Sequence, residues 1–106
     1  MNEFEEYMSG AEMISAERRR QITQEGYSPG HDDQWKNKEI AKAALVYLAY
    51  YTSKAIWLHL SGNWPWGPDA WKPKNSIRNL VRAGALIAAE IDRYKRLDEQ
   101  ILMKVR

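Results

Sequence analysis

Apolar residues recur at helical spacing along most of this chain, and they predict three main helices. The first, over about residues 10–25, carries a thin apolar stripe. The second, over residues 37–60, is apolar on most of its faces, which is typical of a helix in the middle of the packing. The third, over residues 76–104, repeats apolar residues at alternating spacings of three and four. Since no stretch shows the pattern of a strand, we predict an all-α fold.

Capping residues and glycines mark the expected ends of these helices. Ser9 opens a capping-box sequence before the first helix, and Gly26 is a natural left-handed stop after it. Asn37 is expected to cap the second helix, and Asn75 or Ser76 the third. These signals make the helix boundaries specific predictions.

The apolar repeat of the third helix predicts a seam that packs against a partner helix. Its members are Ile77, Leu80, Gly84, Ile87, Ile91, Tyr94, Ile101 and Val105, interrupted by Asp98. Gly84 costs about 1 kcal/mol relative to alanine in a helix interior, so we expect a close neighbouring backbone at Ala43 or Ala44. Residues 97–106 extend beyond the needs of a three-helix core. We therefore predict that they form an oligomerisation extension of a homo-oligomer.

The segment between the second and third helices, Trp64 to Lys74, is rich in tryptophan and proline. Its three prolines exclude a helix or a sheet interior, so we predict a loop. Tryptophans here either close the core or stack on a flat ligand. Lys72 and Lys74 precede the third helix, and Arg78 and Arg82 lie one turn apart at its start, where exposed backbone amides attract phosphate.

Composition narrows the class of protein. The 106 residues are 44% hydrophobic and 28% charged, which fits one domain over residues 1–106, with a flexible N-terminus over residues 1–8. The absence of cysteine excludes disulfides and thiolate metal sites. A formal net charge of +2 is too small to indicate extended nucleic acid. The longest apolar run contains Lys42 and Lys54, and the acidic N-terminus is no signal peptide. We therefore expect a cytoplasmic protein that does not enter a membrane.

The sharpest polar cluster is His31-Asp32-Asp33. Adjacent carboxylates beside an imidazole can bind a divalent ion, relay a proton or hold a sugar hydroxyl. The alternative is that one aspartate simply caps a helix. Arg20 and Gln21 are the residues of the first helix best placed to aim at this turn, although a solvated charged face would explain them equally well.

Two sets of motifs resemble known families. Most of the chain, from Glu17 to about Arg96, resembles a family of small phage and prophage proteins. The motifs are Glu17-Arg18-x-Arg20-Gln21, Glu25-Gly26-Tyr27-x-Pro29-x-His31-Asp32-Asp33, Trp64-Pro65-Trp66, Trp71-Lys72-Pro73-Lys74 and Leu80-Val81-x-Ala83-Gly84-Ala85-Leu86-Ile87-x-Ala89-Glu90-Ile91. Members of that family usually carry no assigned function. This resemblance implies a phage-encoded protein that acts in the cytoplasm of a bacterial host cell.

The second resemblance covers about 20 residues. Arg20-x-Ile22-x-x-Glu25-Gly26-Tyr27-x-x-Gly30-His31-Asp32-Asp33-x-x-Lys36 is similar to the core motif of ryanodine-receptor repeat (RyR) domains, whose later proline-tyrosine segment this chain lacks. Bacterial relatives of that repeat are thought to sense nucleotides or nucleotide-derived signals. The resemblance implies that Tyr27, His31, Asp32 and Asp33 line a ligand pocket, with Arg20 nearby.

These observations favour a binding protein for a nucleotide or nucleotide-derived signal, a sponge that sequesters a host immune messenger in an anti-defence role. No standard catalytic signature is present, and we expect neither a cofactor nor a metal. A metal-dependent all-α nucleotide pyrophosphatase is the enzyme alternative, with magnesium held by His31, Asp32, Asp33 and Glu39, together with Glu90 or Asp92. The second alternative is an inhibitor that binds a host protein through the tryptophan loop. The residues predicted to contact the ligand are Arg20, Gln21, Tyr27, His31, Asp32, Asp33, Trp71, Lys72, Lys74 and Arg78.

Overall fold

The computed structural model describes the backbone of residues 3–105 and the side chains of residues 5–105. Over this range the chain forms helices and no strand, so the prediction of an all-α fold is confirmed. Of the predicted flexible N-terminus, residues 3–7 are helical, while residues 1 and 2 lie outside the described residues. In chain order the elements are α1 (Glu3–Tyr7), α2 (Gly10–Gln24), α3 (Pro29–Asp33), α4 (Glu39–Thr52), α5 (Lys54–Leu60), the 3-10 helices η1 (Ser61–Asn63) and η2 (Pro68–Ala70), and α6 (Ser76–Val105).

The prediction of one helix over residues 37–60 was wrong. Ser53 has an extended backbone, with φ of −167° and ψ of 156°, and it separates α4 from α5. Its hydroxyl accepts a hydrogen bond from the backbone N–H of Ile56 at 3.1 Å, so the same residue ends one helix and caps the next. The described residues therefore hold six α-helices rather than three. The cap of α4 also differs from the expected Asn37, because Lys38 holds that position with a left-handed φ of 65°.

The expected ends of the other two long helices are confirmed. The Ser9 hydroxyl accepts from the backbone N–H of Glu12 at 3.1 Å, and the Glu12 carboxylate accepts from that of Ser9 at 3.2 Å. Gly26 follows the end of α2 with a φ of 73°. The Asn75 side chain accepts from the backbone N–H of Arg78 at 2.9 Å and caps α6. These local hydrogen bonds explain why the boundaries could be predicted.

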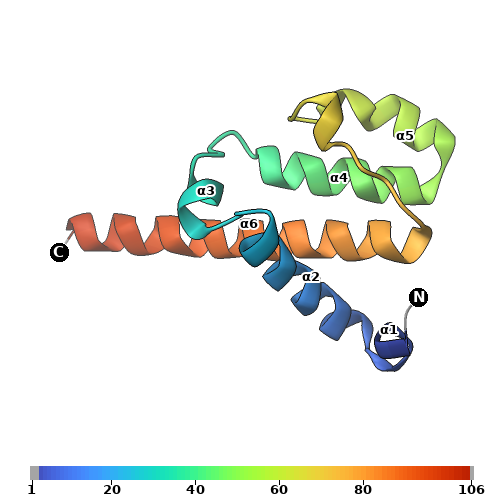
Figure 1. The fold of residues 1–106 in the computed structure, drawn as a ribbon. Helices are drawn as coiled ribbons and strands as arrows, with labels where there is room; N and C mark the ends of the chain where they lie inside the picture. The colour runs from blue at the N-terminus through green and yellow to red at the C-terminus, as the bar shows by residue number, and fades with distance from the viewer. Residues whose placement is uncertain (1–2, 106) are drawn as a thin grey trace.

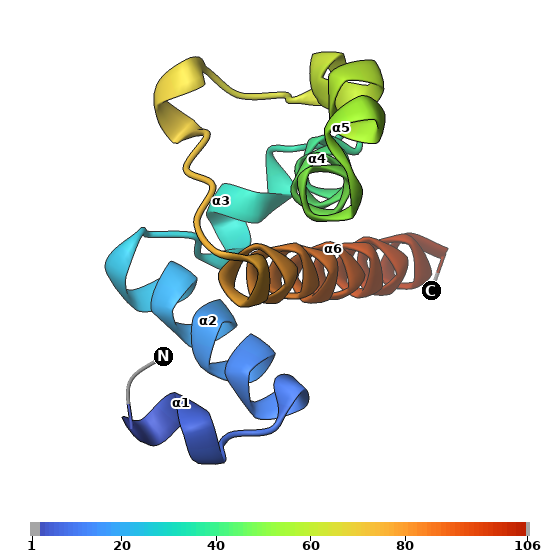
Figure 2. The same cartoon turned by 90° about the vertical axis from the view of Figure 1, so that its right-hand side faces the viewer.

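The long helix α6 is the centre of the fold. Figures 1 and 2 show α4 packed along one side of α6 and α2 crossing its other side, while the C-terminal end of α6 projects past the remaining helices. Alanines on both helices bring α4 and α6 close together, and four tryptophans pack around this contact: Trp35, Trp64, Trp66 and Trp71. The core consists of Ile40, Ala43, Ala44, Tyr47, Ala83, Leu86 and Ala89.

Gly84 faces α2 rather than α4, so the expectation that Ala43 or Ala44 approaches it was wrong. A Cβ atom at Gly84 would lie 2.5 Å from Cδ1 of Ile14 and 2.8 Å from Cγ1. The close neighbour is therefore a side chain of α2, and the glycine lets α2 cross α6 at short range. None of the described helices is long and apolar enough to span a membrane.

The loop after α5 folds back across α4 and is held at its C-terminal end. The backbone N–H of Lys72 donates to the Tyr47 hydroxyl at 3.4 Å. Further along, Asn79 exchanges two hydrogen bonds with the backbone of Lys74, at 2.7 and 2.9 Å. Asn79 is 2% exposed, so this pair anchors the loop to the start of α6. The loop is thereby fixed above the junction of α2, α4 and α6.

Candidate functional site

A cleft of about 270 Å³ opens where α2, α4, α6 and the tryptophan loop meet. Its volume lies just below the range for small-molecule sites, which is roughly 300–1,000 Å³. Aromatic rings and charged groups share its wall, with three cations and two carboxylates. The lining residues are Glu17, Arg20, Gln21, Glu25, Tyr27, Tyr47, Trp64, Trp66, Ala70, Lys72, Arg82 and Leu86.

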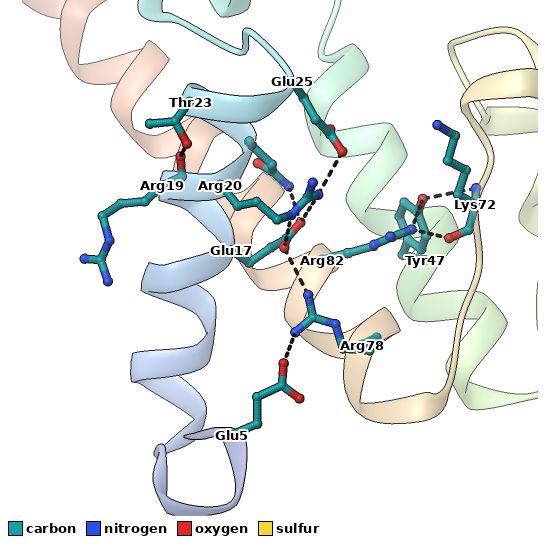
Figure 3. Close-up of polar contacts among 11 residues, drawn as sticks. Glu5, Glu17, Arg19, Arg20, Thr23, Glu25, Tyr47, Lys72, Arg78 and Arg82 are labelled. Carbon is teal, nitrogen blue, oxygen red and sulfur yellow. Dashed lines mark hydrogen bonds and ion pairs between the residues drawn. The ribbon is translucent and has the colours of Figure 1, made fainter. Parts of the chain in front are cut away.

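Glu17 is the buried charge around which the cleft is organised (Figure 3). Its carboxylate accepts from Arg20 Nε and Nη2, both at 2.8 Å, and from Arg78 Nη2 at 3.1 Å. The side chain is only 1% exposed. Burial by itself raises the pKa of Glu17, but the hydrogen bonds and charge of Arg20, with the charges of Arg78 and Arg82, outweigh it. The pKa is therefore below its ordinary value, and the carboxylate is ionised at neutral pH.

Arg20 connects Glu17 to Glu25 at the rim of the cleft. Its Nη2 donates to the Glu25 carboxylate at 2.8 Å. The hydrogen bonds from Arg20 to Glu17, and then those to Glu25, raise the pKa of Arg20 despite partial burial. This arginine is consequently a fixed cation, positioned by two carboxylates rather than free to reorient.

Arg82 spans the opposite side of the cleft from α6 to the loop (Figure 3). Its Nη1 donates to the backbone oxygen of Lys72 and to the Tyr47 hydroxyl, the latter at 3.4 Å. The guanidinium carbon lies 5.9 Å from the centre of the Tyr47 ring, a cation–π distance. The Lys72 side chain itself is exposed at the cleft edge. Arg82, held by these contacts, and the exposed Lys72 therefore border the same opening.

Aromatic side chains form the remaining wall. Tyr27 stacks on His31, with ring centres 4.7 Å apart and planes 6° apart. Trp66 contacts both Trp35 and Trp64, at 5.6 and 5.5 Å between centres. Burial, followed by the charge and hydrogen bond of Glu25, raises the pKa of Tyr27 to about 12. Tyr27 is therefore a neutral ring with its hydroxyl near a carboxylate.

Three polar atoms of the cleft residues have no hydrogen-bond partner within the side chains of residues 5–105. They are Gln21 Oε1, Trp66 Nε1 and Arg82 Nε, and each atom is buried. Gln21 as a whole is 4% exposed, and its amide nitrogen contacts Glu17 at 3.4 Å. A buried polar atom without a hydrogen-bond partner costs about 1–3 kcal/mol of stability, so such atoms are uncommon in folded proteins. One acceptor and two donors of the residues that line the cleft therefore lack a partner among the described residues.

Four of the ten predicted ligand residues line this cleft: Arg20, Gln21, Tyr27 and Lys72. The other six lie outside its lining. Trp71 packs against Tyr47 at 4.6 Å between ring centres, as part of the aromatic cluster above α4. Lys74 is exposed beside its backbone contact with Asn79. Arg78 lies below the cleft, where it joins Glu17 to Glu5.

In the His31-Asp32-Asp33 cluster, the two carboxylates form ion pairs with arginines of other helices, and the histidine adjoins the cleft. Asp32 is 2% exposed and accepts from Arg18 Nη2 at 2.6 Å. Asp33 accepts from Arg96 of α6 at 2.8 Å. His31 lies between Tyr27 and Trp35, stacked on the first ring and edge-on to the second. The two carboxylates thus hold α3 against α2 and α6, while the imidazole supports the cleft wall.

Several residues that line the cleft were not predicted from the sequence, and only some of them belong to a pattern that the sequence shows. Trp64, Trp66 and Arg82 belong to the tryptophan and basic clusters that the sequence shows. Glu17 stands in the Glu17-Arg18-x-Arg20-Gln21 motif of the first helix. Glu25, Tyr47, Ala70 and Leu86 had no local signal, because their place in the cleft depends on how distant helices pack.

The carboxylates required by the pyrophosphatase alternative are dispersed. Asp33 pairs with Arg96, Glu90 pairs with Arg93 at 2.5 Å, and Glu39 accepts from the backbone N–H of Asn37 at 2.5 Å. Within the part of the chain that the structure describes, no three histidine, aspartate or glutamate side chains gather as a metal-binding group.

Comparisons with protein-family models, with curated proteins and with solved structures gave no significant match to this chain.

Proposed function

We propose that this protein binds a nucleotide or a nucleotide-derived signal in the cleft between α2, α4 and α6. The observation that carries the proposal is the combination of aromatic rings, cations and unpartnered buried polar atoms around one opening of about 270 Å³. A nucleotide combines a flat base, hydroxyls and an anionic phosphate, and each part has a matching group in that lining.

The base would lie against the aromatic wall of Tyr27 and Trp66, with Trp66 Nε1 or Gln21 Oε1 satisfying its polar edge. Lys72 would neutralise phosphate, and Arg82 Nε would add a directed hydrogen bond. The hydroxyl acceptors first expected at Asp32 and Asp33 are engaged by Arg18 and Arg96. Glu25, at the cleft rim, is the better acceptor for a sugar hydroxyl.

Such a role requires affinity for the ligand but no catalysis. If the chain is encoded by a phage, as its motifs suggest, sequestration of a host messenger would be enough to blunt a nucleotide-based immune signal. The role then depends on tight binding and slow release rather than on turnover.

A thermal-shift screen with nucleotides, cyclic dinucleotides and ADP-ribose-type compounds, with and without magnesium, tests the proposal. A ligand present at about 100 times its Kd stabilises the fold by about 2.7 kcal/mol. For a domain of this size that raises the Tm by roughly 10–20 °C. Intact compound recovered after incubation distinguishes binding from turnover.

The loop supplies a matched pair of charge variants. Lys72→Glu reverses a cation at the cleft, whereas Lys74→Glu reverses an exposed cation two residues away that does not line it. We expect the first to weaken binding at least tenfold and the second to leave it within about twofold, since one directed charge contact is worth about 1.5–3 kcal/mol. No stabilisation by any compound, or equal losses in the two variants, would refute this assignment.

A further inference from the structure

The apolar seam of α6 is open along its C-terminal part. Ile87 is 48% exposed, Ile91 55%, Ile101 52% and Val105 78%. Nearer the N-terminus of α6, Ile14 of α2 covers the seam at Gly84. From Ile87 onward the apolar residues of the seam are all about half exposed or more. The open seam is therefore residues 87–105, about 27 Å of helix.

The remaining helices contact the far side of α6. Asp33 of α3 pairs with Arg96, and the buried Arg93 also points away from the seam. Since positions two residues apart on a helix point in nearly opposite directions, Arg96 is across the helix from Tyr94. Figure 1 shows the end of α6 extending past α3. A second helix can thus lie along the seam without displacing any element of the fold.

We propose that this seam pairs with the same seam of a second copy of the chain, in antiparallel orientation. A spacing that alternates between three and four interlocks best with a helix of the same repeat, and α6 of another copy has it by construction. The inference is independent of the proposed ligand, because none of the residues that line the cleft belongs to residues 87–105.

Asp98 decides the orientation. It occupies a seam position between Tyr94 and Ile101. In a parallel pair, Asp98 would face Asp98 of the partner subunit, which places two carboxylates together in an apolar contact. In an antiparallel pair centred on residue 96, Asp98 faces Tyr94 of the partner subunit, whose hydroxyl can donate to the carboxylate. The same register places Ile91 against Ile101 of the partner subunit and Ile87 against Val105 of the partner subunit.

Sedimentation and light scattering of the full chain test the pairing. We expect a dimer, and we expect Ile91→Glu to be monomeric, because it buries a charge in the centre of the seam. Met103→Glu is the matched control, since Met103 is 74% exposed on the opposite side of the same helix. Circular dichroism of each variant checks that the helices remain. A monomeric wild type, or dimers of equal strength in both variants, would overturn the proposal.

Disulfide cross-linking tests the orientation, and the chain has no cysteine to interfere. In the antiparallel pair, residue 91 lies about 15 Å along the axis from its own equivalent, too far for a disulfide. Ile91→Cys and Ile101→Cys should therefore remain uncross-linked when each is oxidised alone and should cross-link when mixed. Self-cross-linking of either single variant would show a parallel pair and contradict the proposal.

Discussion

Replacing Glu17 with glutamine keeps the size of the side chain and removes the buried negative charge between α2 and α6. The carboxylate is 1% exposed and accepts hydrogen bonds from Arg20, Gln21 and Arg78. With glutamine, amide hydrogens meet guanidinium hydrogens at one side of that site. The perturbation therefore breaks a buried charge network without opening a cavity.

The expected loss of stability depends on the partners that each arginine keeps after the substitution. Removing one partner of a fully buried ion pair costs about 3–5 kcal/mol. Arg20 and Arg78, however, are 31% and 23% exposed, and they keep Glu25 and Glu5 as second partners. Solvent and those partners lower the expected loss to about 2–3 kcal/mol. For a domain of this size this corresponds to a Tm lower by roughly 10–20 °C.

Urea denaturation followed by far-UV circular dichroism measures this loss, with no ligand present. Glu99→Gln, an exposed carboxylate of α6, is the matched control and should change the free energy of unfolding by less than about 0.5 kcal/mol. A Glu17→Gln protein as stable as that control would refute the reasoning.

The same variant has a pH signature. Because the pKa of Glu17 is below 4.5 in the folded state, its contribution is fully present above about pH 4.5 and is lost as the pH falls through the lower folded value. The stability difference between wild type and Glu17→Gln should therefore be constant near neutral pH and shrink in acid. A difference that grows as the pH falls below 4.5 would contradict the direction of the shift.

Two further predictions concern packing and the acidic pair. Gly84→Ala should destabilise the fold by about 1 kcal/mol, because the clash with Ile14 exceeds the helix-propensity gain. The same change should stabilise the fold when Ile14 is alanine. Stabilisation in the native background would disprove the close contact. Asp32→Asn should cost about 2–3 kcal/mol because it strands the part-buried Arg18, whereas Asp33→Asn should cost less than about 1 kcal/mol. Urea denaturation measures both, and equal losses for the two aspartates would argue against the burial difference.

The features that sequence predicted best are those set by neighbouring residues. The capping box at Ser9, the left-handed Gly26 and the Asn75 cap all depend on hydrogen bonds or dihedral angles within a few positions. The break at Ser53 was missed because the apolar pattern continues through it. Trp57, after the break, packs against Tyr50, before it, so both segments keep an apolar face.

The candidate site was less predictable, since its members meet through tertiary packing. In the sequence, Asp32 and Asp33 look like free ligand groups, because their arginine partners are 14 and 63 residues away. Glu17 stands in a charged stretch of the first helix, which is typical of a solvated face, and its burial requires α2 to cross α6 at Gly84. Tyr47 stands in the apolar pattern of the helix predicted over residues 37–60, and nothing local in the sequence indicates that its hydroxyl faces Lys72 and Arg82.

The central claim is that the cleft between α2, α4 and α6 binds a nucleotide-type ligand, and the indole N–H resonances of the tryptophans test it most directly. Trp66 Nε1 is an unpartnered donor at the cleft, and Trp57 Nε1 is also buried without a partner but lies outside the lining. Titration of labelled protein with ADP, ADP-ribose and a cyclic dinucleotide should shift the Trp66 indole signal, assigned from Trp66→Phe, and leave the Trp57 signal in place. If none of the three compounds moves the Trp66 signal, or if only the Trp57 signal responds, the account of this cleft is contradicted.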